Sequence, residues 1–152
     1  MPAIDLARRL LLAASLGAAL GLEREYHQKP AGLRTNILIA LGSALLTTLS
    51  SSIGGAGATP DRIAAQIVTG IGFLGGGAIL RSGTSVHGMT TAATIWVNAA
   101  TGMAVGAGEF TTATMATVLT LIVLAVLAPL ESYFERRAGR EDHQATKARR
   151  RN

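Results

Sequence analysis

The chain lacks cysteine and is poor in aromatic and charged residues. None of its 152 residues is Cys, only 4% are aromatic and only 15% are charged. The absence of Cys excludes disulfides, thiolate metal sites and cysteine nucleophiles. Scarce aromatic residues together with 18 glycines are typical of closely packed membrane helices, because an aqueous core normally uses larger side chains.

The charges that are present lie mostly between apolar runs. Half of the 14 Lys and Arg residues fall within residues 136–151. A bilayer core about 30 Å thick needs about 20 helical residues. Five stretches meet or approach that length, at residues 3–22, 35–53, 63–80, 90–106 and 110–130. The sequence therefore predicts an all-α fold, a polytopic membrane helix bundle with five transmembrane helices.

The distribution of basic residues predicts the orientation of the bundle. With the N-terminus outside and the C-terminus inside, eleven of the 14 Lys and Arg residues lie on the cytoplasmic side. Only Arg8, Arg9 and Arg62 then lie outside, as the preference for cytoplasmic basic residues favours. We predict a transmembrane domain over residues 1–131 and a basic cytoplasmic tail over residues 132–152. The tail is expected to be solvated and to fix the topology through its positive charge. The alternative is that it contacts anionic lipid headgroups. No nucleic-acid partner is expected.

The first apolar run has features of a secretory signal, since Arg8 and Arg9 precede it. No small-residue cleavage site follows, because the run ends in Glu23-Arg24-Glu25, so we expect a retained helix. Asp5 stands at helical spacing from both arginines, which favours an interfacial ion pair. The alternative is a binding or gating group.

Glycine spacing points to helix packing. The stretch Gly70-Ile71-Gly72-Phe73-Leu74-Gly75 matches G-x-G-x-x-G, but no acidic residue follows at the distance a dinucleotide site requires. Small residues four apart let membrane helices approach closely. The pairs with this spacing are Gly17/Gly21, Gly72/Gly76 and Gly102/Gly106. Whether the third helix breaks at its consecutive glycines, residues 75–77, is left open.

Polar residues form a stripe on the fourth predicted helix. They are Thr91, Thr94, Asn98 and Thr101, which recur three and four residues apart. In lipid such a stripe faces other helices, because an unpaired amide in hydrocarbon costs several kcal/mol. We expect interhelical hydrogen bonding, with a substrate or partner site as the alternative. Arg62 and Gln66 similarly share a face near the start of the third helix.

A charged cluster ends the first helix. Glu23 and Glu25 have the carboxylates for acid–base work or cation binding, but mutual salt bridges with Arg24, Arg34 and Arg81 are the favoured interpretation. The histidines lack metal-site spacing and no Ser/His/Asp arrangement is recognisable. We therefore expect no enzyme activity, no cofactor and no metal site.

These motifs resemble the MgtC/SapB family when they are read together. The matching blocks are Gly21-Leu22-Glu23-Arg24-Glu25, Pro30-Ala31-Gly32-Leu33-Arg34-Thr35, Arg62-Ile63-Ala64-Ala65-Gln66-Ile67-Val68, Gly70 to Gly77, Gly88-Met89-Thr90-Thr91-Ala92-Ala93-Thr94-Ile95-Trp96 and Gly102-Met103-Ala104-Val105-Gly106. The resemblance runs over about residues 16–108, with the blocks in the family's order and spacing.

The resemblance implies a multi-pass protein of the bacterial inner (plasma) membrane, linked to magnesium limitation and to virulence. Members of the family are described as restraining the F-type ATP synthase, with that enzyme and a small regulatory peptide as partners. The family's motif positions fall on Glu23, Arg24, Glu25, Arg34, Thr35, Arg62, Gln66, Thr90, Thr91, Trp96 and Asn98. Larger members have a soluble C-terminal domain, so this chain resembles a short member or the membrane domain alone.

Two functions from different classes are therefore expected of the bundle. The first is a non-enzymatic membrane regulator that binds other membrane proteins and associates with itself, with a dimer as the expected oligomer. The alternative is a small oligomeric ion or solute transporter or channel, because buried Arg, Glu and Asn side chains are what a pathway requires.

Overall fold

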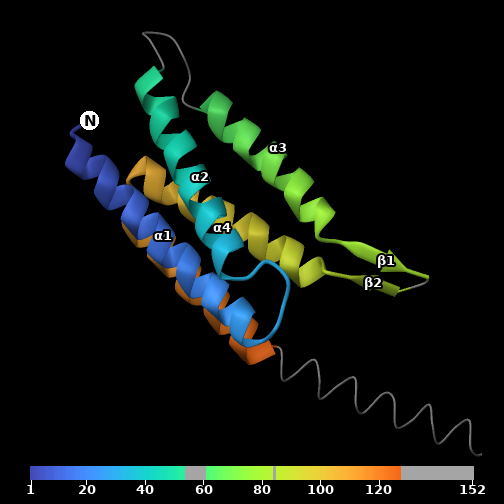
Figure 1. Ribbon diagram of the computed structural model, residues 1–152. Helices are drawn as coiled ribbons and strands as arrows, with labels where there is room; N and C mark the ends of the chain where they lie inside the picture. Colours follow the sequence, from blue (N-terminus) through green and yellow to red (C-terminus); the bar gives the residue numbers. More distant parts are fainter. Residues whose placement is uncertain (54–60, 84, 128–152) are drawn as a thin grey trace, which may run out of the picture. The chain divides into compact units, whose positions relative to one another are not determined.

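The computed structural model describes residues 1–53, 61–83 and 85–127, and among these the side chains of 51–53 and 61–63 are left aside. The described elements are α1 (Ala3–Tyr26), α2 (Leu33–Ile53), α3 (Asp61–Gly77), β1 (Leu80–Ser82), β2 (Ser85–His87) and α4 (Met89–Ala107), followed by a helix over Phe110–Leu127 (Figure 1). All five predicted helices are present in this part of the chain. The end of the fifth predicted helix, residues 128–130, and the basic tail lie outside the described residues.

α1 is longer than the sequence predicted. It begins after Pro2, whose extended backbone precedes the first turn, and it ends at Tyr26 instead of residue 22. The charged cluster therefore belongs to the last helical turn. The following turn places Gln28 and Ala31 at positive φ, 53° and 56°. The Glu25 carboxylate then accepts a hydrogen bond from the Leu33 backbone N–H at 3.0 Å, which pairs one of the free amides at the start of α2.

α2 and α4 are the central packing elements of the described residues, since they contact each other and both contact α1 and α3. Glycines on α1 and α4 allow the close approach. A Cβ placed on Gly17 would lie 2.6 Å from the Asn36 carbonyl oxygen, and one on Gly106 would lie 2.5 Å from the Ala44 carbonyl oxygen. A buried apolar cluster fills the space between these helices and the start of the Phe110–Leu127 helix, with Ala13, Ala40, Ala44, Val105 and Ala113 at its centre.

α3 packs mainly against α4. Gly75 lies against Ala92, and a second buried cluster contains Ile39, Ile67, Ile71, Ile95 and Ala99. The helix runs without a break through Gly75 and Gly76 and ends at Gly77. The predicted end at residue 80 was therefore wrong by three residues.

A short antiparallel hairpin follows α3 and was not predicted. β1 pairs with β2 in the register Leu80↔His87, Arg81↔Val86 and Ser82↔Ser85. Gly88 stands at φ 89° where the hairpin passes into α4, and its missing Cβ lets the Ala78 carbonyl oxygen approach. This hairpin is the one exception to the predicted all-α fold among the described residues. Gly83 stands at φ 61°, a backbone conformation that glycine adopts readily and that a tight turn requires.

Two described helices are long and apolar enough to cross a membrane. They contain the windows Leu33–Ser50, with a mean hydropathy of 1.3, and Phe110–Leu127, with a mean hydropathy of 2.2. Five crossings and their orientation remain predictions. The chain divides into a unit of Met1–Thr120 and a second unit from Leu121 onward, of which the structure describes only the helical residues up to Leu127.

Candidate functional site

Arg24 is the most buried cation in the described part of the chain, with 4% of the residue exposed. Its Nη2 donates a hydrogen bond to Thr91 Oγ1 at 3.0 Å, which joins the end of α1 to the start of α4. The Glu23 carboxylate lies 3.9 Å from Arg24 Nη1 and supplies the opposite charge. A buried charge requires such partners, because an unpaired one costs several kcal/mol.

Asn98 and Asn36 form a second link, between α4 and α2. Both residues have no exposed surface. The Asn98 Nδ2 group donates to the Asn36 backbone oxygen at 2.7 Å and to Asn36 Oδ1 at 3.0 Å. Asn36 Nδ2 in turn donates to the backbone oxygens of Ala31 and Gly32, so one amide pair fixes α4, α2 and the connection before α2.

Asn36 was missed by the sequence analysis. The signal that was available is its place in the second apolar run, where it is the one amide side chain in the charge-free interval of residues 35–60. An amide within a membrane helix needs hydrogen-bond partners on another element. The same argument that singled out Asn98 therefore applies to Asn36.

The predicted stripe on α4 faces inward. Its four members, Thr91, Thr94, Asn98 and Thr101, are all buried. The Thr94 hydroxyl donates to the Thr90 backbone oxygen at 2.8 Å, within the helix. Among the described residues, several buried atoms have no hydrogen-bond partner: Glu23 Oε2, Arg24 Nε, Thr47 Oγ1, Asn98 Oδ1 and Thr101 Oγ1.

The outer members of the charged cluster make only part of the expected salt bridges. Glu23 Oε1 lies 3.0 Å from His27 Nδ1, and Glu25 accepts from the start of α2. Arg34 and Arg81 are exposed, and neither forms an ion pair with a described residue. The expected salt bridge between Glu23 and Arg24 is therefore present, whereas those to Arg34 and Arg81 are not formed among the described residues. Local helical geometry satisfies the carboxylates first, since His27 and the Leu33 amide are nearer in the chain.

A separate polar contact holds the far end of α4. Arg9 Nη1 donates to the Gly106 backbone oxygen at 2.6 Å, while Arg9 Nε lies 3.3 Å from Asp5 Oδ2. The same carbonyl accepts from Thr48 Oγ1 at 3.2 Å, and the guanidinium lies 5.8 Å from the centre of the Phe110 ring. The expected Asp5–Arg9 ion pair is present, and it presents a cation to the C-terminal end of α4, where the helix dipole favours one.

The other predicted residues lie outside these links. Thr35 and Gln66 line a groove, Thr90 is exposed, and Trp96 is 53% exposed beside a small apolar cavity of 160 Å³. The Arg62 side chain lies outside the described residues. Gly21 and Gly102 are tightly packed, whereas a Cβ on Gly72 or Gly76 would meet no atom within 4 Å.

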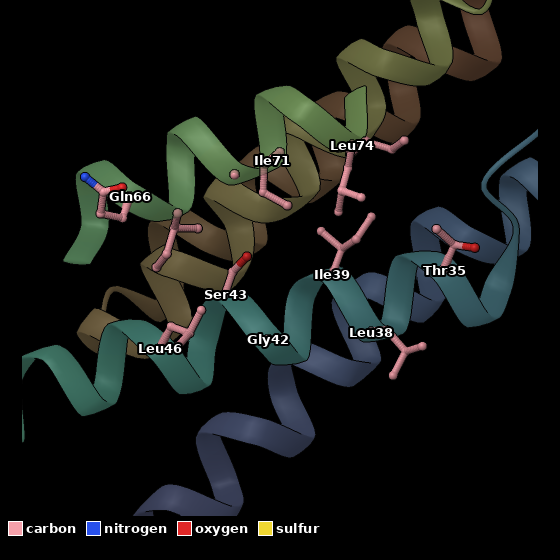
Figure 2. A pocket seen from close by; sticks show the side chains of 12 residues that line it. Thr35, Leu38, Ile39, Gly42, Ser43, Leu46, Gln66, Ile71 and Leu74 are labelled. Carbon is pink, nitrogen blue, oxygen red and sulfur yellow. The ribbon is translucent and has the colours of Figure 1, made fainter. Parts of the chain in front are cut away.

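The groove lies between α2 and α3 and has a volume of about 770 Å³. Its lining is apolar apart from Thr35, Ser43 and Gln66. Figure 2 shows Leu46 and Gln66 toward one end of the groove and Thr35 and Leu74 toward the other. Within the described ranges no group of three His, Asp or Glu side chains is placed to hold a metal ion.

Comparison with known proteins identifies the family. A family model described as the MgtC family matches residues 10–133. The chain belongs to the MgtC family. This membership and the two apolar helices together indicate a membrane protein.

Three relatives of this MgtC family chain come from different bacteria. It is 44% identical over 125 residues to the uncharacterized protein slr0014 of Synechocystis, covering 82% of this chain and 53% of that protein. It is 51% identical over 104 residues to protein MgtC of Salmonella typhimurium, covering 68% of this chain and 44% of that protein. It is 49% identical over 109 residues to an Escherichia coli protein named "Putative magnesium transporter YhiD", covering 67% of this chain and 51% of that protein. The chain spans about half the length of the curated relatives it matches, and no solved structure matches it.

Proposed function

We propose that this MgtC family chain is a non-enzymatic regulator in the bacterial inner membrane that acts by binding other membrane proteins. It crosses the bilayer five times, with the N-terminus outside and the C-terminus in the cytoplasm. The family resemblance supports the F-type ATP synthase or a small regulatory peptide as the partner, and magnesium limitation as the setting.

The use of the buried polar groups is the observation that supports a regulator. A permeation pathway needs polar side chains that face a continuous cavity. Here Arg24 is bonded to Thr91, and the Asn98 amide is bonded to Asn36. These contacts join α1, α2 and α4 to one another, so the groups with the highest desolvation cost serve packing. Exposed apolar side chains such as Trp96 remain available for contact with another membrane protein.

A transporter or channel is the second candidate. The name of the Escherichia coli relative supports it, as do the buried oxygens of Glu23, Asn98 and Thr101, which lack hydrogen-bond partners among the described residues. Such oxygens are the ligand type that hard cations such as Mg²⁺ take.

A flux assay separates the two candidates. The purified chain is reconstituted into proteoliposomes, and Mg²⁺ entry is compared with that in protein-free liposomes and with Asn98→Ala and Arg34→Ala variants. The regulator predicts no entry above the protein-free level. Entry that falls in both variants would show that the chain is a transporter and would end the regulator proposal.

The regulatory role has its own positive test. Inverted membrane vesicles that contain F-type ATP synthase are assayed for ATP-driven proton pumping with and without the chain. We expect less pumping when the chain is present and no change in vesicles whose pumping depends on respiration. Reporter fusions after Asn152 and within residues 54–60 check the orientation, and a periplasmic signal from the C-terminal fusion would overturn it.

A further inference from the structure

The groove between α2 and α3 contains glycines that no close packing within the described structure requires. A Cβ on Gly42 or on Gly70 would meet no atom of the described structure within 4 Å, although both residues line the groove. Glycine inside a helix is less stable than alanine by about 0.5–1 kcal/mol, so it normally has a packing reason. Gly17, Gly21, Gly102 and Gly106 have that reason inside the chain. The two groove glycines instead leave room for something outside it.

Ser43 indicates what kind of occupant fits. The residue is only 3% exposed, and its hydroxyl makes no hydrogen bond to any residue that the structure describes. Figure 2 shows the Ser43 side chain on the side of α2 that lines the groove, and its Cβ also lies close to Gly102 of α4. A hydroxyl that meets only hydrocarbon in the groove lacks a hydrogen-bond partner, which costs about 1–3 kcal/mol. Lipid hydrocarbon has no group that pairs with it, whereas a polar side chain on another transmembrane helix does.

The chain presents a matching helix face. Ala65, Thr69, Gly72 and Gly76 are small, uncharged and exposed, and they follow one another on α3 at intervals of three and four residues. We call this face the α3 stripe. The Thr69 hydroxyl donates its proton to the Ala65 backbone oxygen at 3.1 Å, which leaves the oxygen lone pairs free to accept a hydrogen bond.

Ser43 and Thr69 lie at comparable positions along the groove. Two copies in one membrane are related by rotation about the bilayer normal, so each residue keeps its depth. Figure 2 places Leu46 of α2 and Gln66 of α3 at the same end of the groove. Ser43 lies three residues from Leu46, and Thr69 lies three residues from Gln66. At a rise of 1.5 Å per residue, each of the two residues lies about 4.5 Å along its own helix from the residue at that end.

We propose that the α2/α3 groove receives α3 from a second copy of this chain, with the Ser43 hydroxyl of one copy donating to Thr69 of the other. The proposal rests on the proposed membrane function, since the depth argument requires a common bilayer. Gly70 faces the groove while Gly72 faces the other way, because residues two apart on a helix point about 200° apart. The contact is therefore heterologous and builds a ring or a chain of copies in place of the two-fold dimer expected from the sequence.

Disulfide crosslinking tests this contact, because the natural chain has no cysteine. Ser43→Cys and Thr69→Cys variants with different affinity tags are co-expressed, and native membranes are oxidised. A disulfide forms only when the Cβ atoms come within about 3.5–4.5 Å. We expect a disulfide between the two differently tagged chains. A chain with both substitutions should give a ladder of crosslinked species beyond two copies.

Two matched controls test the depth and the groove. Gly76→Cys lies on the same α3 stripe but about 10.5 Å further along the helix, so paired with Ser43→Cys it should crosslink at least tenfold less. Gly70→Leu, added to both chains, fills the groove at a position where a Cβ meets no atom within 4 Å. We expect it to abolish the Ser43–Thr69 crosslink while the melting temperature in detergent is kept.

Three outcomes would overturn the proposal. One is efficient crosslinking of Ser43→Cys to itself, which indicates a two-fold contact. Another is the absence of a mixed disulfide although a lipid-permeant maleimide labels both thiols. The third is crosslinking that Gly70→Leu leaves unchanged. Magnesium entry in the flux assay would refute the regulator without affecting these crosslinks, so the two proposals can fail separately.

Discussion

The Asn98 side chain donates both of its hydrogen bonds to a single residue, Asn36, through the backbone oxygen at 2.7 Å and Oδ1 at 3.0 Å. The two hydrogen bonds therefore depend both on the position of the α2 backbone and on the orientation of the Asn36 side chain. Asn36 is in turn held by the carbonyl oxygens of Ala31 and Gly32, before α2 begins. This relationship makes α4 sensitive to the connection between α1 and α2.

Asn98→Ala should destabilise the chain by about 1–3 kcal/mol, because it removes the donor group and leaves the buried Asn36 Oδ1 without its partner on α4. The measurement is the free energy of unfolding in detergent micelles, followed by circular dichroism. A double-mutant cycle with Asn36→Ala should give a coupling of about 1 kcal/mol, within the range found for interhelical hydrogen bonds in membranes. Additive effects of the two substitutions would show that the amides do not act as a pair.

Thr91→Val should also destabilise the chain, by about 1.5–3 kcal/mol, because it leaves the buried Arg24 guanidinium without its acceptor on α4. The matched control is Thr90→Val. Thr90 is the exposed neighbour on the same helix, and a surface substitution of this kind changes stability by less than about 0.5 kcal/mol. Equal losses of stability in the two variants would show that the Arg24–Thr91 hydrogen bond does not fix α1 to α4.

Arg9→Met should loosen the C-terminal end of α4, because the Gly106 carbonyl loses a charged donor at 2.6 Å. Amide hydrogen exchange in residues 100–107 should become at least fivefold faster, which corresponds to about 1 kcal/mol of lost local stability. Arg8→Met is the control. Arg8 is adjacent in the chain but exposed, and it makes no hydrogen bond to a described residue. Exchange that responds equally to both variants would indicate a general charge effect.

Sequence reasoning predicted the five helices and the inward stripe of α4, because apolar runs and three- or four-residue spacing are properties of the local chain. It identified Asn98 as a buried amide but did not find its partner Asn36. That pairing depends on which helices lie side by side, and several arrangements of five helices satisfy the same apolar pattern. The hairpin was missed for a different reason: three-residue strands have little periodicity, and the turn depends on the left-handed conformation of Gly83. The α2/α3 groove likewise depends on packing that no local pattern describes.

Glycine spacing alone also failed to separate glycines that pack tightly inside the chain from glycines that have no neighbour there. Gly102→Ala should destabilise the detergent-solubilised chain by at least about 2 kcal/mol, because its Cβ would collide with the Ala40 carbonyl oxygen and lie 2.9 Å from the Ser43 Cβ. Gly72 has the same sequence spacing but no neighbour within 4 Å, so Gly72→Ala should stabilise the same preparation by about 0.5–1 kcal/mol. The two unfolding free energies should therefore shift in opposite directions. A loss of stability in both variants would mean that the Gly72 side of α3 is packed within the chain.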